Sequence, residues 1–212
     1  MNHKLIESLH NTHPKLTIVM ASKYLEPQDF DAFIHGGITN FGENRDHALM
    51  TKKEALKDCD ITWHFIGTLQ TKKVKKIIND IDILHTLDRL KFAEAIEKYR
   101  NTVLPCFIQV NISLESQKHG ILESELTSFL NALKPFKKIH VIGLMGMAEE
   151  TNNKARIDAQ FAKLSRLKST VQKQYPHITE LSMGMSQDYE LALKHGATHL
   201  RLGRILLEDN HG

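Results

Sequence analysis

The chain has few cysteines, few aromatic residues and little proline. Its 212 residues include two cysteines, five prolines and one tryptophan, and 7% of them are aromatic. Cys59 and Cys106 are too few and too far apart to form a disulfide framework, so we expect two ordinary buried thiols. The composition excludes a small protein that disulfides hold together, and it predicts one folded domain over residues 1–212.

The chain also lacks a long apolar run. The longest run without charged or strongly polar residues is 141–148, whereas a membrane-spanning helix needs about 20 residues. The amino terminus carries Glu7 early and has no apolar stretch before a cleavage site, so it does not resemble a secretion signal. We therefore expect a cytoplasmic protein without a membrane partner.

An excess of one charge is missing too. The net charge is +3, and the main basic cluster, residues 72–76, alternates with apolar residues at helical spacing. A solvated helix face explains this cluster better than a polyanion site, so we expect no nucleic acid partner. The 13 histidines form no HExxH motif and pair with no Cys-x2-Cys motif, so we expect no metal site.

Short apolar, β-branched runs alternate with longer amphipathic segments along the chain. The predicted strands are 16–22, 38–43, 62–67, 83–88, 104–112, 139–147, 178–184 and 199–203. The predicted helices are 4–10, 27–35, 45–57, 71–79, 89–100, 123–132, 154–174 and 187–195.

This alternation predicts parallel strands with right-handed crossovers. Eight strand–helix units can close, so we favour an α/β fold, a single (β/α)8 TIM-type barrel with an extra N-terminal helix. A doubly wound open sheet is the alternative, but no G-x-G-x-x-G motif follows any predicted strand. In a barrel, functional groups lie at the carboxyl ends of the strands.

Lys23 directly follows the first predicted strand, where a long side chain can enter the barrel mouth. An amine among apolar strand residues and other cations is poorly solvated when charged, which favours the neutral nucleophile of Schiff-base chemistry. A surface lysine whose ammonium stays in water is the alternative.

Glycine and serine mark the ends of the last two predicted strands. Gly184 and Gly203 would let the backbone approach an anion closely, and the Ser186 hydroxyl could donate to it. Barrels commonly bind phosphate at this place. Both glycines could equally be plain turn residues.

Other polar residues occur near strand ends. Asn44 could bind a ligand and Glu43 could pair with a cation, or both could cap the helix that begins near Arg45. His64, between two aromatic residues, is better explained as a core histidine than as a catalyst. Asn111 could line the barrel interior or satisfy a backbone group.

In this order and spacing, the motifs resemble those of the pyridoxal phosphate homeostasis proteins, a family of barrels similar to the N-terminal domain of alanine racemase. The resemblance runs from Leu16 to about Leu207. It rests on these segments: Ala21-Ser22-Lys23, Phe41-Gly42-Glu43-Asn44, Trp63-His64-Phe65-Ile66-Gly67, Leu69-Gln70, Lys72, His85-Thr86-Leu87-Asp88, Gln109-Val110-Asn111-Ile112, Gly143-Leu144-Met145, Leu181-Ser182-Met183-Gly184-Met185-Ser186 and Arg201-Leu202-Gly203.

The resemblance implies pyridoxal 5'-phosphate as the cofactor, held as a Schiff base on Lys23. It further implies a phosphate cradle made of Ser186, Gly203 and the amide of Arg204. It also implies that Arg201 faces the pyridine nitrogen and that Asn44 lies near the cofactor. The chain departs from the family at Arg204, where Thr or Ser is frequent, and after Leu207, where Phe-Gly is frequent. The hydroxyl of that residue is thereby lost to the phosphate, although a backbone amide remains and the guanidinium could substitute.

An arginine opposite the pyridine nitrogen has a chemical consequence of its own. A guanidinium only donates hydrogen bonds, so the nitrogen must accept and stay unprotonated. Such a ring stabilises a carbanion poorly, which suits a holding role or simple proton exchange at an α-carbon.

Three functions follow from the resemblance and from Lys23. The favoured one is a non-catalytic carrier for vitamin B6 homeostasis, a monomer that could deliver pyridoxal phosphate to apo-enzymes that depend on it. A racemase of low activity needs a second acid/base group; residues 208–212 are too few for a further domain, and we expect Tyr24 to face away from Lys23. An aldolase that uses Lys23 without the cofactor is the third.

Overall fold

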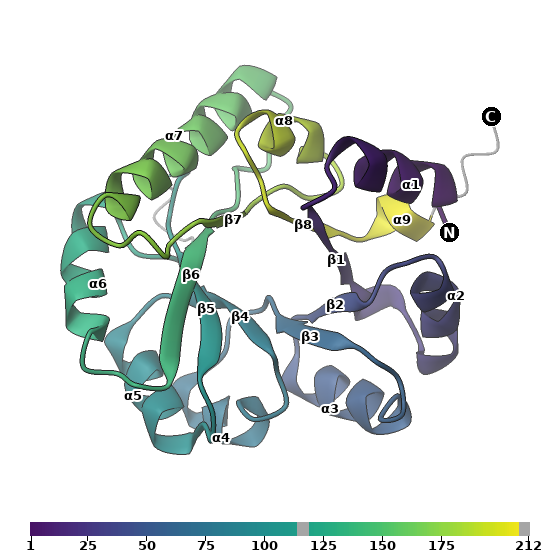
Figure 1. Cartoon of the computed structure of the whole chain (residues 1–212), viewed down its shortest axis with the longest axis horizontal. Helices are drawn as coiled ribbons and strands as arrows, with labels where there is room; N and C mark the ends of the chain where they lie inside the picture. The colour runs from purple at the N-terminus through teal and green to yellow at the C-terminus, as the bar shows by residue number, and fades with distance from the viewer. Residues whose placement is uncertain (114–118, 208–212) are drawn as a thin grey trace.

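A computed structural model describes residues 1–113 and 119–207 of the chain. In this part, eight parallel strands close into one barrel in the order β1 to β8, and helices surround it (Figure 1). The strands are β1 (Thr17–Ala21), β2 (Asn40–Glu43), β3 (Thr62–Phe65), β4 (Ile83–Leu87), β5 (Leu104–Gln109), β6 (Ile139–Met145), β7 (Glu180–Ser182) and β8 (His199–Leu202). The predicted (β/α)8 barrel is confirmed.

The helices follow the predicted segments, with several first turns in 3-10 form. The α-helices are α1 (His3–Thr12), α2 (Phe30–His35), α3 (Asp46–Ala55), α4 (Val74–Ile77), α5 (Leu90–Tyr99), α6 (Leu126–Leu133), α7 (Lys154–Gln172), α8 (Tyr189–Lys194) and α9 (Arg204–Leu207). The 3-10 turns are η1 (Ser22–Tyr24), η2 (Pro27–Asp29), η3 (Thr71–Lys73) and η4 (Glu123–Glu125). The sequence did not predict η1 or α9, and residues 208–212, which entered the racemase argument, lie outside the described residues.

The main core lies between the barrel and the surrounding helices. On β1, Ile18 and Met20 join this core, because successive strand residues face opposite sides of the sheet. Phe30 of α2 packs against Phe41 of β2, with the rings tilted by 34° and their centroids 4.4 Å apart, so a helix contacts a strand directly. The alternate residues of the strands point into the barrel.

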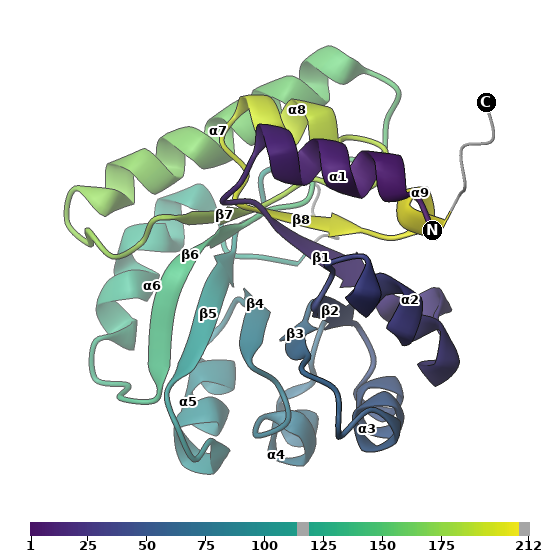
Figure 2. The same ribbon diagram turned by 45° about the vertical axis from the view of Figure 1, so that its right-hand side comes forward.

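The first and last helices of the described chain lie side by side (Figure 2). The Asn2 backbone N–H donates to the Leu206 carbonyl at 2.9 Å, and the Asn2 side chain donates to the Ile205 carbonyl at 3.2 Å. The extra N-terminal helix α1 therefore holds α9 in place, beside the end of β8.

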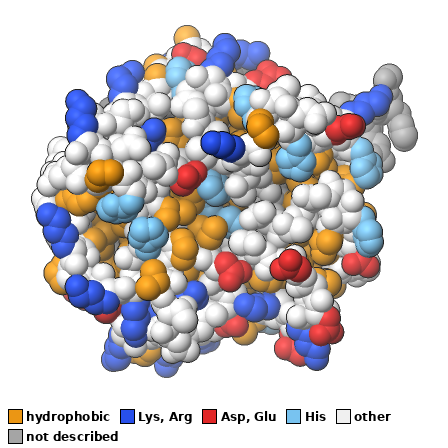
Figure 3. Space-filling model, viewed as in Figure 1, with side chains coloured by type: hydrophobic (Ala, Val, Ile, Leu, Met, Phe, Trp, Pro, Cys, Tyr) orange, Lys and Arg blue, Asp and Glu red, His pale blue; other side chains and the backbone are white. Residues whose placement is uncertain are grey.

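Charged side chains of both signs are spread around the face seen in Figure 3, and hydrophobic ones gather nearer its centre. No helix among the described residues is long and apolar enough to cross a membrane. Within the same residues, no group of three His, Cys, Asp or Glu side chains is arranged to hold a metal ion. Both cysteines are free thiols; Cys106 is buried as predicted, whereas Cys59 is only half-buried.

Candidate functional site

Lys23 lies on the 3-10 turn η1, directly after β1, at the carboxyl end of the barrel. Its side chain is exposed. The prediction that the barrel itself removes water from this amine is therefore wrong, because the chain leaves β1 in a tight turn that carries Lys23 out of the apolar strand. The amine is accessible to a ligand that enters the mouth.

The sequence predicted that Tyr24 faces away from Lys23, and this prediction is wrong. The Lys23 ammonium lies over the Tyr24 ring, 4.6 Å from its centroid. The two residues belong to a 3-10 turn and not to a strand, so the alternation of strand side chains does not apply. The Lys23 ammonium lowers the pKa of the Tyr24 phenol, and the charge of Arg204 acts in the same direction.

A buried ion pair supports the turn that carries Lys23. The Lys52 ammonium of α3 donates to Glu43 Oε1 at 2.5 Å and to the Ser22 carbonyl at 2.6 Å. The Ser22 hydroxyl donates to the same carboxylate oxygen at 2.9 Å. We call Ser22, Glu43 and Lys52 the Glu43 cluster. It confirms that Glu43 pairs with a cation, and it fixes the backbone immediately before Lys23.

Asn44 is exposed at the rim, directly after β2. It does not cap α3: the residue at the cap is Arg45, and no side-chain hydrogen bond caps this helix. The neighbouring strand end packs tightly against its backbone, because a Cβ added at Gly67 would lie 2.2 Å from the Asn44 carbonyl oxygen. The side chain is therefore held beside the mouth by backbone contacts.

The ends of β7 and β8 form a second part of the mouth. The Gly203 backbone N–H donates to the Ser186 hydroxyl at 3.3 Å, so the predicted phosphate residues lie together. A Cβ added at Gly203 would meet only Ala21, at 3.6 Å or more, so the space above this peptide is open. Gly184 serves the turn instead, with a φ of +93° and a tight approach to Ala192.

Asp188 holds the loop that carries Ser186, although no sequence motif pointed to it. Its carboxylate accepts a hydrogen bond of 2.6 Å from the Met185 backbone N–H. Burial raises the pKa of Asp188, and the Met185 hydrogen bond and the charge of Arg201 oppose that rise. The loop is thus closed at the start of α8.

Arg201 is buried on β8, two residues before Gly203. Its guanidinium donates to the Ser182 hydroxyl at 2.6 Å and to the Gly146 carbonyl at 3.1 Å. Burial lowers the pKa of Arg201 to about 10, so the side chain is a cation at neutral pH. Arg204, by contrast, is exposed at the start of α9.

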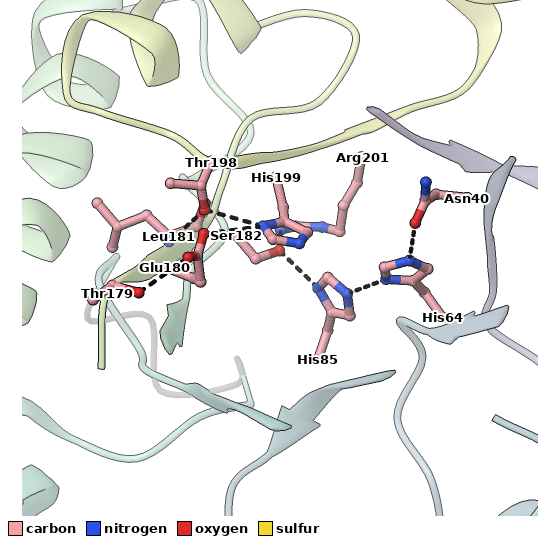
Figure 4. A network of polar contacts seen from close by, with 10 residues as sticks. All are labelled: Asn40, His64, His85, Thr179, Glu180, Leu181, Ser182, Thr198, His199 and Arg201. Carbon is pink, nitrogen blue, oxygen red and sulfur yellow. Dashed lines mark hydrogen bonds and ion pairs between the residues drawn. The ribbon is translucent and has the colours of Figure 1, made fainter. Parts of the chain in front are cut away.

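Two histidines lie inside the barrel below Arg201 (Figure 4). His64 is fully buried, as predicted for a core histidine, and it contacts His85 and Asn40. His85 belongs to one of the segments that carry the family resemblance, but the sequence predicted no role for it. Asn111 is buried just beyond β5, where its side-chain oxygen accepts the Ser113 hydroxyl at 3.3 Å.

The comparisons with known proteins agree on one family. Residues 28–210 match the family model described as "Alanine racemase, N-terminal domain". A pyridoxal phosphate homeostasis protein of Aquifex aeolicus is 37% identical over 88% of this chain and 83% of its own length. Its namesake in Escherichia coli K12 is 31% identical over 91% of this chain and 85% of its own length.

Solved structures show the same barrel. PipY of Synechococcus elongatus without PLP has a TM-score of 0.92 and 29% identity, covering 98% of this chain and 100% of its own. The structure of PipY with PLP bound has a TM-score of 0.89 and 29% identity, covering 97% of this chain and 99% of its own. Alanine racemase from Corynebacterium glutamicum shares only the fold, with a TM-score of 0.74 and 14% identity over 95% of this chain and 58% of its own.

Proposed function

The chain belongs to the family of the alanine racemase N-terminal domain, and within it to the pyridoxal phosphate homeostasis proteins; from this premise we propose that it binds pyridoxal 5'-phosphate at the carboxyl end of its barrel. The single observation that carries the proposal is the placement of an accessible lysine beside the open space above Gly203. Met20 of β1 pairs with Leu202 of β8, so Lys23 and Gly203 follow neighbouring strand ends.

The residues present fit this cofactor. Its phosphate would accept from the Ser186 hydroxyl and the Arg204 amide in the open space above Gly203. It would also accept from the Gly203 amide, in place of the bond that this N–H donates to Ser186. The bound cofactor supplies an aldehyde that reacts with a primary amine and releases water, and Lys23 is the amine that we assign to it. Asn44 lies at the same rim.

We further propose that the chain holds the cofactor without substantial turnover. Arg201 can only donate a hydrogen bond, so opposite the pyridine nitrogen it would keep that atom unprotonated and weaken it as an electron sink. Tyr24 lies against Lys23 itself, and so does not supply an acid/base group on the face opposite this lysine. The relatives' name, homeostasis protein, supports a holding role in vitamin B6 balance.

Borohydride reduction tests the attachment at Lys23. The isolated protein should have a visible absorption band that borohydride bleaches, leaving a pyridoxyl group on the Lys23 peptide by mass analysis. Lys23→Ala should be colourless, whereas Lys15→Ala, a change at another exposed lysine, should be as yellow as the wild type. A wild-type chain isolated without a band, and unable to acquire one from added cofactor, would contradict the proposal and favour the aldolase alternative.

Deuterium exchange tests the holding role. Loss of α-deuterium from alanine should be no faster with the wild-type chain than with Lys23→Ala. A rate well above that of Lys23→Ala would instead identify a racemase.

We also propose that the chain is a monomer, that it is cytoplasmic and that it delivers the cofactor to apo-enzymes. Light scattering tests the first of these and should give a mass near 24.2 kDa.

A further inference from the structure

A chain of hydrogen bonds crosses the barrel interior from Arg201 to β2 (Figure 4). The Arg201 guanidinium lies 2.6 Å from Ser182 Oγ, which lies 2.8 Å from His85 Nδ1. His85 Nε2 lies 2.8 Å from His64 Nδ1, and His64 Nε2 lies 2.9 Å from Asn40 Oδ1. We call Ser182, His85, His64 and Asn40 the histidine relay.

The Asn40 end of the relay fixes the direction of every bond in it, because an amide oxygen can only accept. His64 therefore carries its proton on Nε2 and donates it to Asn40 Oδ1, which leaves Nδ1 of the neutral ring as an acceptor. His85 then donates from Nε2 to His64 Nδ1, and its own Nδ1 accepts from the Ser182 hydroxyl. Arg201 can only donate, so its bond to Ser182 Oγ agrees with this direction.

Electrostatics favours this direction over its reverse. In the reverse arrangement a histidine N–H would point its positive end toward the side of the buried guanidinium. In the arrangement above, each ring turns its acceptor nitrogen toward Arg201 and its N–H away. Burial lowers the pKa of His64 to about 3 and that of His85 well below its usual value, so both rings are neutral dipoles.

Arg201 needs this support, because it is a buried cation. Within residues 1–113 and 119–207, no carboxylate lies within ion-pairing distance of its guanidinium. Asp188 raises the pKa of Arg201 only through longer-range attraction. Oriented neutral dipoles stabilise the charge without neutralising it, which leaves the cation available to a ligand.

We propose that the residues of the histidine relay are positioning residues, which aim the Arg201 guanidinium at the pyridine nitrogen of the cofactor and thereby keep that nitrogen unprotonated. The proposal rests on the proposed function. The Ser182 and Gly146 contacts hold the two terminal nitrogens of Arg201 and so fix the plane of the group. Within the described part of the chain, these two contacts use one N–H of each terminal nitrogen, and we assign a further donor to the ring.

The first test uses the protein without cofactor. Long-range ¹H–¹⁵N correlation spectra of the ¹⁵N-histidine-labelled chain at pH 7 should show His64 and His85 as neutral rings protonated on Nε2. His64→Phe and His85→Phe each remove one set of signals and so assign them. Protonation on Nδ1, or a charged ring, would overturn the relay whether or not the chain binds pyridoxal phosphate.

The second test reads the cofactor ring directly. The wild-type chain loaded with pyridoxal phosphate that carries ¹⁵N in its ring should show an unprotonated nitrogen between pH 6 and 8. Ser182→Ala should introduce a protonated population and raise the dissociation constant of the cofactor about tenfold, since one charged hydrogen bond is lost. Ser182→Thr, which keeps a hydroxyl, should restore the wild-type spectrum.

His199→Phe is the matched control. His199 is a buried histidine beside His85, with ring centroids 6.0 Å apart. Among the described residues, its Nδ1 hydrogen-bonds to the Thr198 hydroxyl at 3.0 Å and not to a member of the relay. Its substitution should leave the ring nitrogen unchanged. An unchanged nitrogen in Ser182→Ala, or an equal change in His199→Phe, would overturn the positioning role. A wild-type chain that binds no cofactor refutes the proposed function instead, and the first test then still decides the direction of the relay.

Discussion

The Glu43 cluster and the histidine relay are both buried and polar, yet one is built from opposite charges and the other from neutral groups. In the Glu43 cluster, a fully buried carboxylate meets the Lys52 ammonium at 2.5 Å. Among the described residues, the hydrogen bonds of the Arg201 guanidinium go to a hydroxyl and a carbonyl, which are neutral groups. The Lys52 ammonium compensates the charge of Glu43 by direct contact, whereas Asp188 attracts the charge of Arg201 from a longer range.

The difference corresponds to what each group supports. The Glu43 cluster holds a backbone turn, and neither Ser22 nor Lys52 is assigned to the ligand, so the pairing of Lys52 with Glu43 takes no donor away from it. Arg201 is assigned to a ligand, and a carboxylate partner would compete for its donors. We therefore expect a buried network around a binding residue to orient that side chain without neutralising its charge or using all of its hydrogen-bond donors.

Breaking the Glu43 cluster should have the largest effect on stability. Glu43→Gln leaves the buried Lys52 ammonium without its counter-ion, which should lower the free energy of unfolding by about 3–5 kcal/mol in urea titrations. The double variant Glu43→Gln/Lys52→Met removes both charges and should be less destabilised than Glu43→Gln alone. If the double variant loses as much free energy of unfolding as Glu43→Gln and Lys52→Met together, the two side chains are not coupled.

The second largest effect on stability should come from acid, which charges the buried histidines of the barrel interior on unfolding. Burial lowers the pKa of His64 to about 3 and of His199 to about 4, and it also lowers that of His85. The unfolded chain then binds more protons than the folded one below about pH 6.5, so stability falls as the pH drops from 6.5 toward 4. Each histidine contributes up to about 1.4 kcal/mol per pH unit in this window.

Urea unfolding at pH 5 and pH 7 measures that dependence. His85→Phe should make the loss of stability between the two pH values smaller than in the wild type, because one of the titrating groups is gone. Equal losses in the two proteins would mean that His85 is not neutral when folded.

An exposed ion pair should show the smallest effect and sharpen the comparison. Lys73 lies 3.0 Å from Asp46 and lowers the pKa of this carboxyl, but 40% of the Lys73 side chain is exposed. Asp46→Asn should change the free energy of unfolding by less than about 1 kcal/mol, and 1 M salt should remove most of the difference. A loss as large as that of Glu43→Gln would show that burial does not separate the two pairs.

The sequence predicted the barrel because hydrophobic periodicity reports on each strand and helix separately. It missed η1, since Ser22 and Lys23 directly follow the apolar run of β1 and carry no turn signal. That error also placed Tyr24 on the wrong side of Lys23. It missed α9 because a helix of four residues, rich in isoleucine and leucine, has the same appearance as the end of a strand.

The polar networks were harder to predict than the fold. His64 could be recognised as a core histidine from its aromatic neighbours, but its hydrogen bonds reach residues on β2 and β4, and their meeting depends on strand register. Lys52 left a weak signal, a lysine in the second turn of the helix after Glu43. Ser186 and Gly203 were found because both follow strand ends, which a parallel barrel brings to one rim.

The contact between Asn2 and the carbonyls of Ile205 and Leu206 has a practical consequence for anyone who prepares this protein. The helix that it holds begins at Arg204, whose amide we assign to the phosphate. A purification tag fused in front of Met1 would therefore disturb the contacts that hold this short helix. Enzymatic removal of the tag should therefore change the measured affinity for the cofactor.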